Sequence, residues 1–216
     1  MKVELIDHMG SDLTVVNAAR VSFNKQHDTV ESKDFNLIKY LAKHHHWSPF
    51  AHCFVQFKIK APIFVARQLG KHQVGLCWNE ISRRYVNYDP EFWTAQEGFR
   101  AVTADKKQGS GGLSPFNQEA KSIQNSVNRS CLTAYQELLK IGICEEQARS
   151  VLPQSMMTEW FWSGSLFAFS RVCNLRMSED SQIETKEIAL QIHNQCVRLF
   201  PHSWKALTFN YDIGEG

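Results

Sequence analysis

Apolar and polar side chains alternate cleanly over residues 53–60. The apolar side chains on one face are those of Val55, Phe57 and Ile59. This alternation predicts a half-buried strand of an antiparallel sheet. We expect Ala61 and Pro62 to end the strand, and a short helix to follow from residue 63 to residue 70. A second short strand is predicted over residues 1–6.

Apolar positions three or four residues apart predict two helices in the first fifth of the chain. Asp12 is expected to cap the first helix and Asp34 the second. The apolar stripes consist of Val15, Val16 and Ala19 in the first helix and Leu37, Ile38 and Leu41 in the second. The second helix is expected to end in residues 43–46, Lys-His-His-His, whose side chains would meet the carbonyl groups of the last turn.

The second half of the chain has helical spacing nearly throughout. One helix is predicted by Ile123, Val127, Leu138 and Leu139 and ended by Gly142; the last one, over residues 182–199, carries Ile188, Ile192, Cys196 and Leu199. Further helical pieces are expected over residues 145–151 and 160–175, with Pro153 between them. The polar, glycine-rich residues 103–118 predict a loop. We therefore expect a helix-rich α+β fold with a small antiparallel sheet.

Composition narrows the class of protein. The 216 residues, 43% hydrophobic and 21% charged, suit one soluble domain spanning residues 1–216. A net charge of +2 favours neither a nucleic-acid-binding protein nor a membrane-surface protein. The sequence shows no signal peptide and no membrane span, so a cytoplasmic protein is expected. The six cysteines are scattered without CxxC spacing, which favours reduced thiols over disulfides or zinc.

Chemistry-bearing residues are densest in residues 67–73 and 79–85. These stretches combine three arginines, a lysine, a histidine, a carboxylate and a serine with Trp78, Ile81 and Tyr85. A phosphate group can be bound by backbone N–H groups, a serine hydroxyl and the paired N–H donors of arginine. Aromatic side chains nearby can pack against a heterocycle. A solvated helix-to-loop face with paired charges is the alternative. Chemistry alone leaves both interpretations open.

Residues 79–85, Asn-Glu-Ile-Ser-Arg-Arg-Tyr, resemble the NExSxRY half of the RHRxxSxNExSxRY motif of flavin-dependent thymidylate synthases. Further segments resemble that family in the same order along the chain: residues 18–23 (AARVSF), 46–52 (HWSPFAH), 61–68 (APIFVARQ), 149–153 (RSVLP) and 174–176 (NLR). The chain differs from the family at Lys71-His72-Gln73, where the motif has RHR, and at Ser165 and Phe167, where asparagine and arginine are usual.

The resemblance implies reductive methylation of dUMP to dTMP. FAD would be the cofactor, 5,10-methylenetetrahydrofolate the carbon donor and NADPH the reductant. It also implies a homotetramer with active sites shared between subunits, small-molecule partners and no nucleic acid or membrane. Two alternatives remain: a related flavin enzyme acting on another pyrimidine nucleotide, and a non-catalytic nucleotide-binding homologue.

The resemblance also assigns residues to the nucleotide. Arg176 is expected to be catalytic, because a guanidinium at the uracil edge stabilises negative charge that reaches C5. Arg149, Arg84 and Ser82 would hold the 5′-phosphate, and Glu80 would meet the ribose. The full set expected to bind dUMP is Gln68, Lys71, Glu80, Ile81, Ser82, Arg83, Arg84, Arg149 and Arg176.

The residues expected to bind FAD are Ser48, Lys71, His72, Gln73, Asn79, Glu80, Ser165 and Arg171, with Ser22 a weaker candidate. His46 is a folate-site candidate whose ring would stack on another ring. No metal is expected, because adjacent histidines on a helix end point about 100° apart. Cys77 is expected to pack rather than act as a nucleophile. Arg67 is expected to form a structural ion pair.

Overall fold

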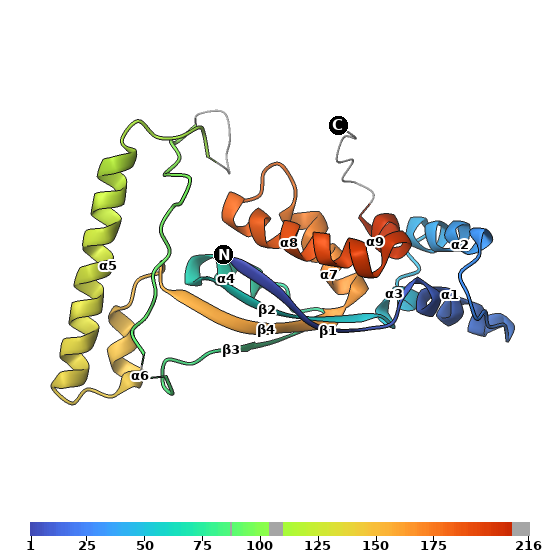
Figure 1. Cartoon of the computed structure of the whole chain (residues 1–216), viewed down its shortest axis with the longest axis horizontal. Coiled ribbons are helices and arrows are strands. Elements are labelled where there is room, and N and C mark those ends of the chain that lie inside the picture. The colour runs from blue at the N-terminus through green and yellow to red at the C-terminus, as the bar shows by residue number, and fades with distance from the viewer. Residues whose placement is uncertain (87, 104–109, 209–216) are drawn as a thin grey trace. The chain divides into compact units, whose positions relative to one another are not determined.

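The computed structural model describes residues 1–86, 88–103 and 110–208. A four-stranded antiparallel sheet has the order β1-β2-β4-β3 (Figure 1). Its strands are β1 (Lys2–Met9), β2 (Phe54–Pro62), β3 (Leu76–Glu80) and β4 (Met157–Ser165). The expected helix-rich α+β class is confirmed.

Contacts between Cα atoms divide the chain into two compact units. Unit 1 comprises Met1, residues 60–71 and residues 80–160. Unit 2 comprises residues 2–59, 72–79 and 161–216. That residues 1–216 form one domain remains a prediction.

Unit 2 holds most of the helices. These are α1 (Asp12–Arg20), η1 (Val21–Phe23), α2 (Ser32–Lys43), α3 (Ser48–Ala51), α7 (Leu166–Arg176), α8 (Ile183–Leu199) and α9 (Pro201–Leu207). Helix α8 contacts α7, α9 and strand β1, and α2 packs against α9 (Figure 1). Phe57, Trp162 and Phe169 are fully buried, and Phe169 meets the other two rings edge to face. Their burial gives this unit its core.

Unit 1 contains α4 (Ile63–Leu69), α5 (Asn117–Lys140), α6 (Glu145–Ala148) and the 3₁₀ turn η2 (Arg149–Val151). The long helix α5 contacts α6 and η2. Val65 and Leu69 of α4 are fully buried, as is Ala148 of α6. The segment between β3 and α5 forms one isolated bridge within itself, between Arg100 and Leu113, and a second from Phe92 to Met156, just before β4.

Most predicted elements are confirmed. The alternation of residues 53–60 gives β2, whose Val55, Phe57 and Ile59 are buried. Helices α2, α4, α5 and α8 fall where spacing predicted them. In the predicted loop over residues 103–118, helix α5 already begins at Asn117, and residues 104–109 lie outside the described part.

The prediction of one helix over residues 160–175 was wrong. Strand β4 runs to Ser165, and α7 begins only at Leu166. Thr158, Trp160, Trp162 and Gly164 are buried in alternation with more exposed neighbours. This two-residue period was hidden because Phe161, between Trp160 and Trp162, is also large and apolar and makes a continuous apolar run. Strand β3 and helix α9 were not predicted.

Both predicted N-caps were displaced. Ser11 is the N-cap of α1, and the carboxylate of Asp12 instead accepts the backbone N–H groups of His202 (3.0 Å) and Ser203 (2.9 Å) in α9. Glu31 is the N-cap of α2, and Asp34 inside the first turn accepts the backbone N–H of Glu31 at 2.9 Å. Each aspartate therefore serves a capping role other than the predicted one.

The end of α2 also differs from the prediction. Backbone N–H groups, not histidine side chains, close its last carbonyls: His46 donates to Leu41 and His45 donates to Ala42. His45 has a left-handed φ of 57°, the conformation usually taken by glycine at this place. The turn fixes the direction in which residues 45–47 leave the helix.

The six cysteines are free thiols, as expected. Burial raises the pKa of the Cys53 thiol to about 12, with the charge of Asp12 adding to the effect. Among the described residues, no helix is long and apolar enough to cross a membrane. No group of three or more metal-ligating side chains is gathered in that same part of the chain.

Candidate functional site

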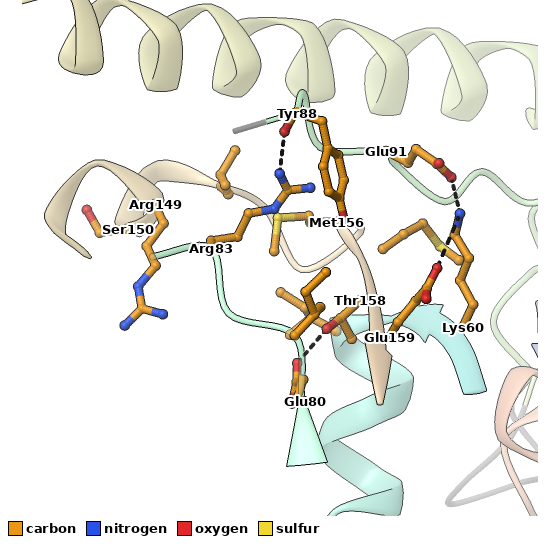
Figure 2. A pocket seen from close by; sticks show the side chains of 14 residues that line it. Lys60, Glu80, Arg83, Tyr88, Glu91, Arg149, Ser150, Met156, Thr158 and Glu159 are labelled. Atoms are coloured by element: carbon orange, nitrogen blue, oxygen red, sulfur yellow. Dashed lines mark hydrogen bonds and ion pairs between the residues drawn. The ribbon is translucent and has the colours of Figure 1, made fainter. Parts of the chain in front are cut away.

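The first candidate site is a hollow of about 480 Å³ in unit 1, here called the signature hollow. It is lined by Lys60, Ile63, Glu80, Ile81, Arg83, Tyr88, Glu91, Arg149, Ser150, Leu152, Met156, Met157, Thr158 and Glu159. Glu80, Ile81 and Arg83 of the first predicted nucleotide segment therefore share one hollow with Arg149, which follows much later in the chain. Ser82 and Arg84, also predicted to hold the phosphate, are not among its lining residues. Figure 2 shows this hollow.

The end of β3 is anchored to β4 on one side of the signature hollow. Thr158 Oγ1 donates to Glu80 Oε1 at 2.6 Å, and the backbone N–H of Ile81 donates to the Glu159 carbonyl at 2.9 Å (Figure 2). Lys60 lies between Glu91 (2.7 Å) and Glu159 (4.0 Å). These contacts fix the carboxylate of Glu80 where the chain leaves the strand.

Arg83 has a structural role. Its side chain is only 7% exposed, Nη1 donates to the Tyr88 carbonyl at 2.6 Å, and the guanidinium lies 4.8 Å from the centre of the Tyr88 ring (Figure 2). The guanidinium is therefore occupied by its contacts with Tyr88. Only its backbone remains suited to a ligand.

Arg84, by contrast, is exposed. Its backbone N–H and its Nε lie 3.4 and 3.3 Å from Ser82 Oγ, and its guanidinium lies 4.9 Å from the Tyr85 ring centre. Arg149, in η2, donates from Nε to the Glu146 carbonyl at 3.2 Å. Neither cation contacts a carboxylate in these interactions, so both suit an anionic ligand.

Arg67 and Gln68, near the end of α4, and Lys71, just beyond it, were each given a role in the sequence analysis. Gln68 is partly buried and Lys71 is exposed. The ion pair predicted for Arg67 is not found within the described residues, where its Nη1 instead donates to the amide oxygen of Gln154 at 3.5 Å. This is a long contact between an exposed cation and a neutral group, so Arg67 adds little to stability.

A second hollow, of about 570 Å³, lies in unit 2 and is here called the aromatic hollow. It is lined by Lys39, Leu41, Ala42, Lys43, His45, His46, Trp47, Phe50, Phe167, Ser170, Arg171, Asn174, Ala206 and Leu207. The rings of Trp47 and Phe167 lie 6.1 Å apart at 38°. No acidic side chain is among these described lining residues. The hollow therefore suits a planar ring that carries negative charge.

Arg176, the predicted catalytic residue, contacts His72, one of the predicted flavin contacts. Arg176 Nε donates to His72 Nε2 at 2.9 Å. Burial lowers the pKa of His72, and the positive charges of Arg176 and Arg171 lower it further. Burial also lowers the pKa of Arg176. A neutral imidazole thus orients a half-buried guanidinium, an arrangement suited to a neutral or anionic heterocycle.

Comparison with known proteins agrees with this geometry. The family model described as "Thymidylate synthase complementing protein" matches residues 4–202. The chain belongs to this family. A flavin-dependent thymidylate synthase of Thermosipho africanus is 37% identical over 215 residues, covering 97% of this chain and 92% of the relative. One from Thermus thermophilus is 38% identical over 204 residues, covering 94% and 74%.

Two solved structures of one methylase share the fold of this chain. The UMP/dUMP methylase PolB from Streptomyces cacaoi, bound with 5-Br dUMP, has a TM-score of 0.88 and 30% identity. That match covers 96% of this chain and 94% of PolB. The same methylase bound with 5-Br UMP has a TM-score of 0.85 and 29% identity. The helix-rich fold with a small sheet is therefore shared with this methylase.

The residues near the aromatic hollow fit the flavin that the family's relatives are named for. Asn174 Nδ2 donates to the Leu207 carbonyl, while its buried Oδ1 accepts no hydrogen bond within the described residues. A heterocycle N–H would satisfy that oxygen. Arg171 and His46 line the same hollow. The donor set and the ring pair suit a flavin or a pterin.

The other predicted flavin contacts lie at element ends. Ser165 is the N-cap of α7, and its Oγ accepts the backbone N–H of Ala168 at 3.2 Å. Ser48 begins α3, Gln73 is exposed just before β3, and Asn79 is exposed within β3, next to its last residue. Ser22 lies in η1. All of these assignments remain predictions.

Sequence reasoning missed several residues of this family member's hollows. Tyr88 and Thr158, the partners of Arg83 and Glu80, carry no pattern that marks them. Lys39 and Lys43 were not assigned to a ligand, because a helix face with two lysines is usually a solvated surface. Trp47 lies in the family-like segment 46–52, but no role was assigned to it. The spacing of Lys39 and Lys43, four residues apart and just before the histidine run, was the available signal.

Proposed function

We propose that this protein is a flavin-dependent thymidylate synthase. Its reaction converts dUMP, 5,10-methylenetetrahydrofolate, NADPH and a proton into dTMP, tetrahydrofolate and NADP⁺. One observation carries the proposal: the NExSxRY-like segment and the Arg149 motif line a single hollow. Membership of the family and the relatives' names support it.

The signature hollow is assigned the phosphate and ribose of dUMP. Arg149 and Arg84 supply guanidinium forks for the phosphate, and Ser82 supplies a hydroxyl already within reach of Arg84. Glu80, held by Thr158, accepts a ribose hydroxyl. Charge-assisted hydrogen bonds of this kind are worth roughly 1.5–3 kcal/mol each. Gln68, Lys71 and Ile81 complete the nucleotide contacts.

Arg176 is assigned the activation of uracil. C5 becomes nucleophilic when negative charge on the ring is stabilised at O4 and N3. His72 holds the guanidinium in one orientation through its Nε2. A preoriented donor costs little reorganisation as charge develops, which is the physical basis of its catalytic effect.

FAD, when bound, supplies the hydride chemistry between NADPH and the methyl group. Ser48, His72, Gln73, Ser165 and Arg171 would hold it, with Lys71, Asn79 and Glu80 as further contacts. His46, at the edge of the aromatic hollow, is assigned to the folate ring. The protein's part is to bind, orient and exclude water.

The direct test is dTMP formation by purified protein, measured by chromatography while each of FAD, NADPH and methylenetetrahydrofolate is omitted in turn. The proposal expects product only in the complete mixture. Product without FAD, or none in the complete mixture from flavin-loaded protein, would refute it.

A second candidate function is methylation of UMP as well as dUMP. The similarity to PolB, a UMP/dUMP methylase, favours including it. Competition between the two nucleotides in the same assay separates the functions: a thymidylate synthase prefers dUMP strongly, whereas a dual methylase turns over both.

We also propose a cytoplasmic homotetramer with active sites shared between subunits, on the basis of the family resemblance. Sedimentation equilibrium of the flavin-loaded protein tests this. A tetramer is expected, and an active monomer would contradict it.

A further inference from the structure

Another hollow lies next to the aromatic hollow. This adjoining hollow, of about 530 Å³, is lined by Phe35, Lys39, Pro201, His202, Lys205 and Ala206. Lys39 of α2 and Ala206 of α9 line both hollows. Since Lys39 and Ala206 line both, the two hollows lie next to each other along helices α2 and α9 of unit 2. We call the two together the α2–α9 track.

The α2–α9 track is cationic along its length. Lys39 and Lys43 lie one turn apart on the same face of α2, with Cα atoms about 6 Å apart along the axis. Lys205 and Arg171 add two more positive charges. No aspartate or glutamate lines either hollow among the described residues, and in that part of the chain Lys39, Lys43 and Lys205 have no ion-pair partner.

The helices that carry these cations are held firmly. Asp12 accepts the N–H groups of His202 and Ser203, which fixes the start of α9. The ring of His202 stacks on Phe35 of α2 at 3.8 Å and 20°. The lysines therefore project from a rigid base, so a ligand need order only flexible side chains.

The type of side chain that lines the track changes from aromatic at one end to cationic at the other. Trp47 and Phe167 supply rings at the aromatic end, where Asn174 Oδ1 lacks a donor within the described residues. Lys39 and Lys205 supply charge at the other end. A ligand that matches this order has a flat ring followed by an extended chain of negative groups.

We propose that the α2–α9 track binds the anionic extension of the ring-bearing co-substrate, namely the carboxylate chain of a polyglutamylated folate. This inference rests on the proposed function for the identity of the co-substrate. Lys39, Lys43 and Lys205 contact successive carboxylates, while the ring lies towards Trp47. The phosphates of a dinucleotide are also negatively charged and could bind the same lysines. The experiments below distinguish the two ligands.

Direct binding tests the inference without turnover. Calorimetric titration of the flavin-loaded protein compares p-aminobenzoyl-pentaglutamate with p-aminobenzoyl-monoglutamate. The pentaglutamate is expected to bind about tenfold more tightly at low salt, and the difference is expected to shrink as salt screens the charges. Equal affinities for the two probes would overturn the carboxylate assignment.

A triple variant, Lys39→Gln, Lys43→Gln and Lys205→Gln, locates the effect. It is expected to bind pentaglutamate no more tightly than monoglutamate, whereas Lys25→Gln, an exposed lysine outside the track, retains the tenfold preference. Circular dichroism and thermal melting confirm folding, and the single variant Lys205→Gln is expected to lose part of the preference. An undiminished preference in the folded triple variant would overturn the inference.

Titration with NADP⁺ tests in parallel whether the track binds the phosphates of a dinucleotide instead of carboxylates. If the triple variant weakens NADP⁺ severalfold while the glutamate probes bind equally to both proteins, the track binds dinucleotide phosphate instead. If neither probe changes, no anion binds there. Since neither readout requires dTMP formation, failure here and failure of the proposed function are separate results.

Discussion

Arg176 Nε donates to His72 Nε2 at 2.9 Å. An arginine stays protonated, so His72 must accept with an unprotonated Nε2 and carry its hydrogen on Nδ1. Burial and the cations Arg176 and Arg171 favour this neutral form, because they lower the pKa of His72. The imidazole thus sets the orientation of the residue assigned to uracil activation.

Replacement of His72 tests this positioning. His72→Phe removes the acceptor and is expected to lower kcat by about 10- to 100-fold, since a misplaced group loses much of its effect. His72→Gln offers a carbonyl oxygen to Arg176 and should recover part of the rate. Steady-state kinetics of both variants measures the difference. Equal kcat for His72→Phe and the parent protein would show that the contact has no catalytic role.

The pH profile gives a second test. Protonation of His72 ends its acceptance from Arg176, and its pKa lies below the usual value of about 6.5. At saturating dUMP, kcat is therefore expected to hold near pH 7 and to fall as the pH drops below about 6.5. The contribution of His72 to stability has the same sign: it is complete above about pH 6.5 and lost as the pH falls toward the lowered pKa.

The His72→Gln variant is the matched control for that profile. Glutamine does not titrate, so the acid limb of kcat should move to lower pH or disappear. If the fall of kcat at acid pH were unchanged in this variant, a group other than His72 would be responsible for it.

Arg83 and Arg84 are neighbours with opposite expected roles. Arg83→Met removes a buried charged donor to the Tyr88 carbonyl and is expected to destabilise the fold by about 1.5–3 kcal/mol. Arg84→Met, at an exposed position, should change stability by less than about 0.5 kcal/mol while raising the KM for dUMP. Thermal unfolding and kinetics of the pair measure both effects. The reverse pattern would refute the assignment of the phosphate to Arg84.

Asp34 is expected to control acid stability. Burial raises its pKa, but the backbone N–H of Glu31 and hydrogen bonds from Arg20 and His27 outweigh burial and lower the pKa from 3.8 to about 2. The stability that Asp34 provides is therefore complete above about pH 4 and is lost as the pH falls to about 2. Asp34→Asn is expected to cost about 3–5 kcal/mol at neutral pH, because Arg20 loses a buried partner.

Urea unfolding at several pH values measures this contribution. Asp28→Asn, at an exposed position in the same region, is the control and should unfold like the parent protein. An Asp34→Asn variant as stable as that control would mean that the buried network contributes nothing net.

Sequence patterns predicted the strand and helices whose periods were clear. The alternation through Val55, Phe57 and Ile59 was unambiguous because the polar residues Gln56 and Lys58 lie between them. Strand β4 was missed because Trp160, Phe161 and Trp162 are consecutive apolar residues, and a run of this kind fits a buried strand or a helix equally. The difference lies in tertiary partners, which spacing does not encode.

Site residues that belong to a recognisable sequence motif could be predicted. Site residues whose role depends on a contact with a distant residue could not. Residues 79–85 and Arg149 were found through resemblance, but nothing local shows that Arg83 turns inward to Tyr88. Asp12 likewise looked like a local cap, although it holds α9 from 190 residues away. Such pairings depend on the packed fold.

The most direct test of the account follows the bond that must break at C5. Flavin-loaded protein is supplied with NADPH, methylenetetrahydrofolate and dUMP tritiated at C5, and tritium released to water is counted against dTMP formed. We predict one tritium released for each dTMP, with release at least about 100-fold slower in Arg176→Ala while flavin reduction by NADPH stays measurable. Tritium retained by the parent protein, or released at its rate by Arg176→Ala, would contradict the account.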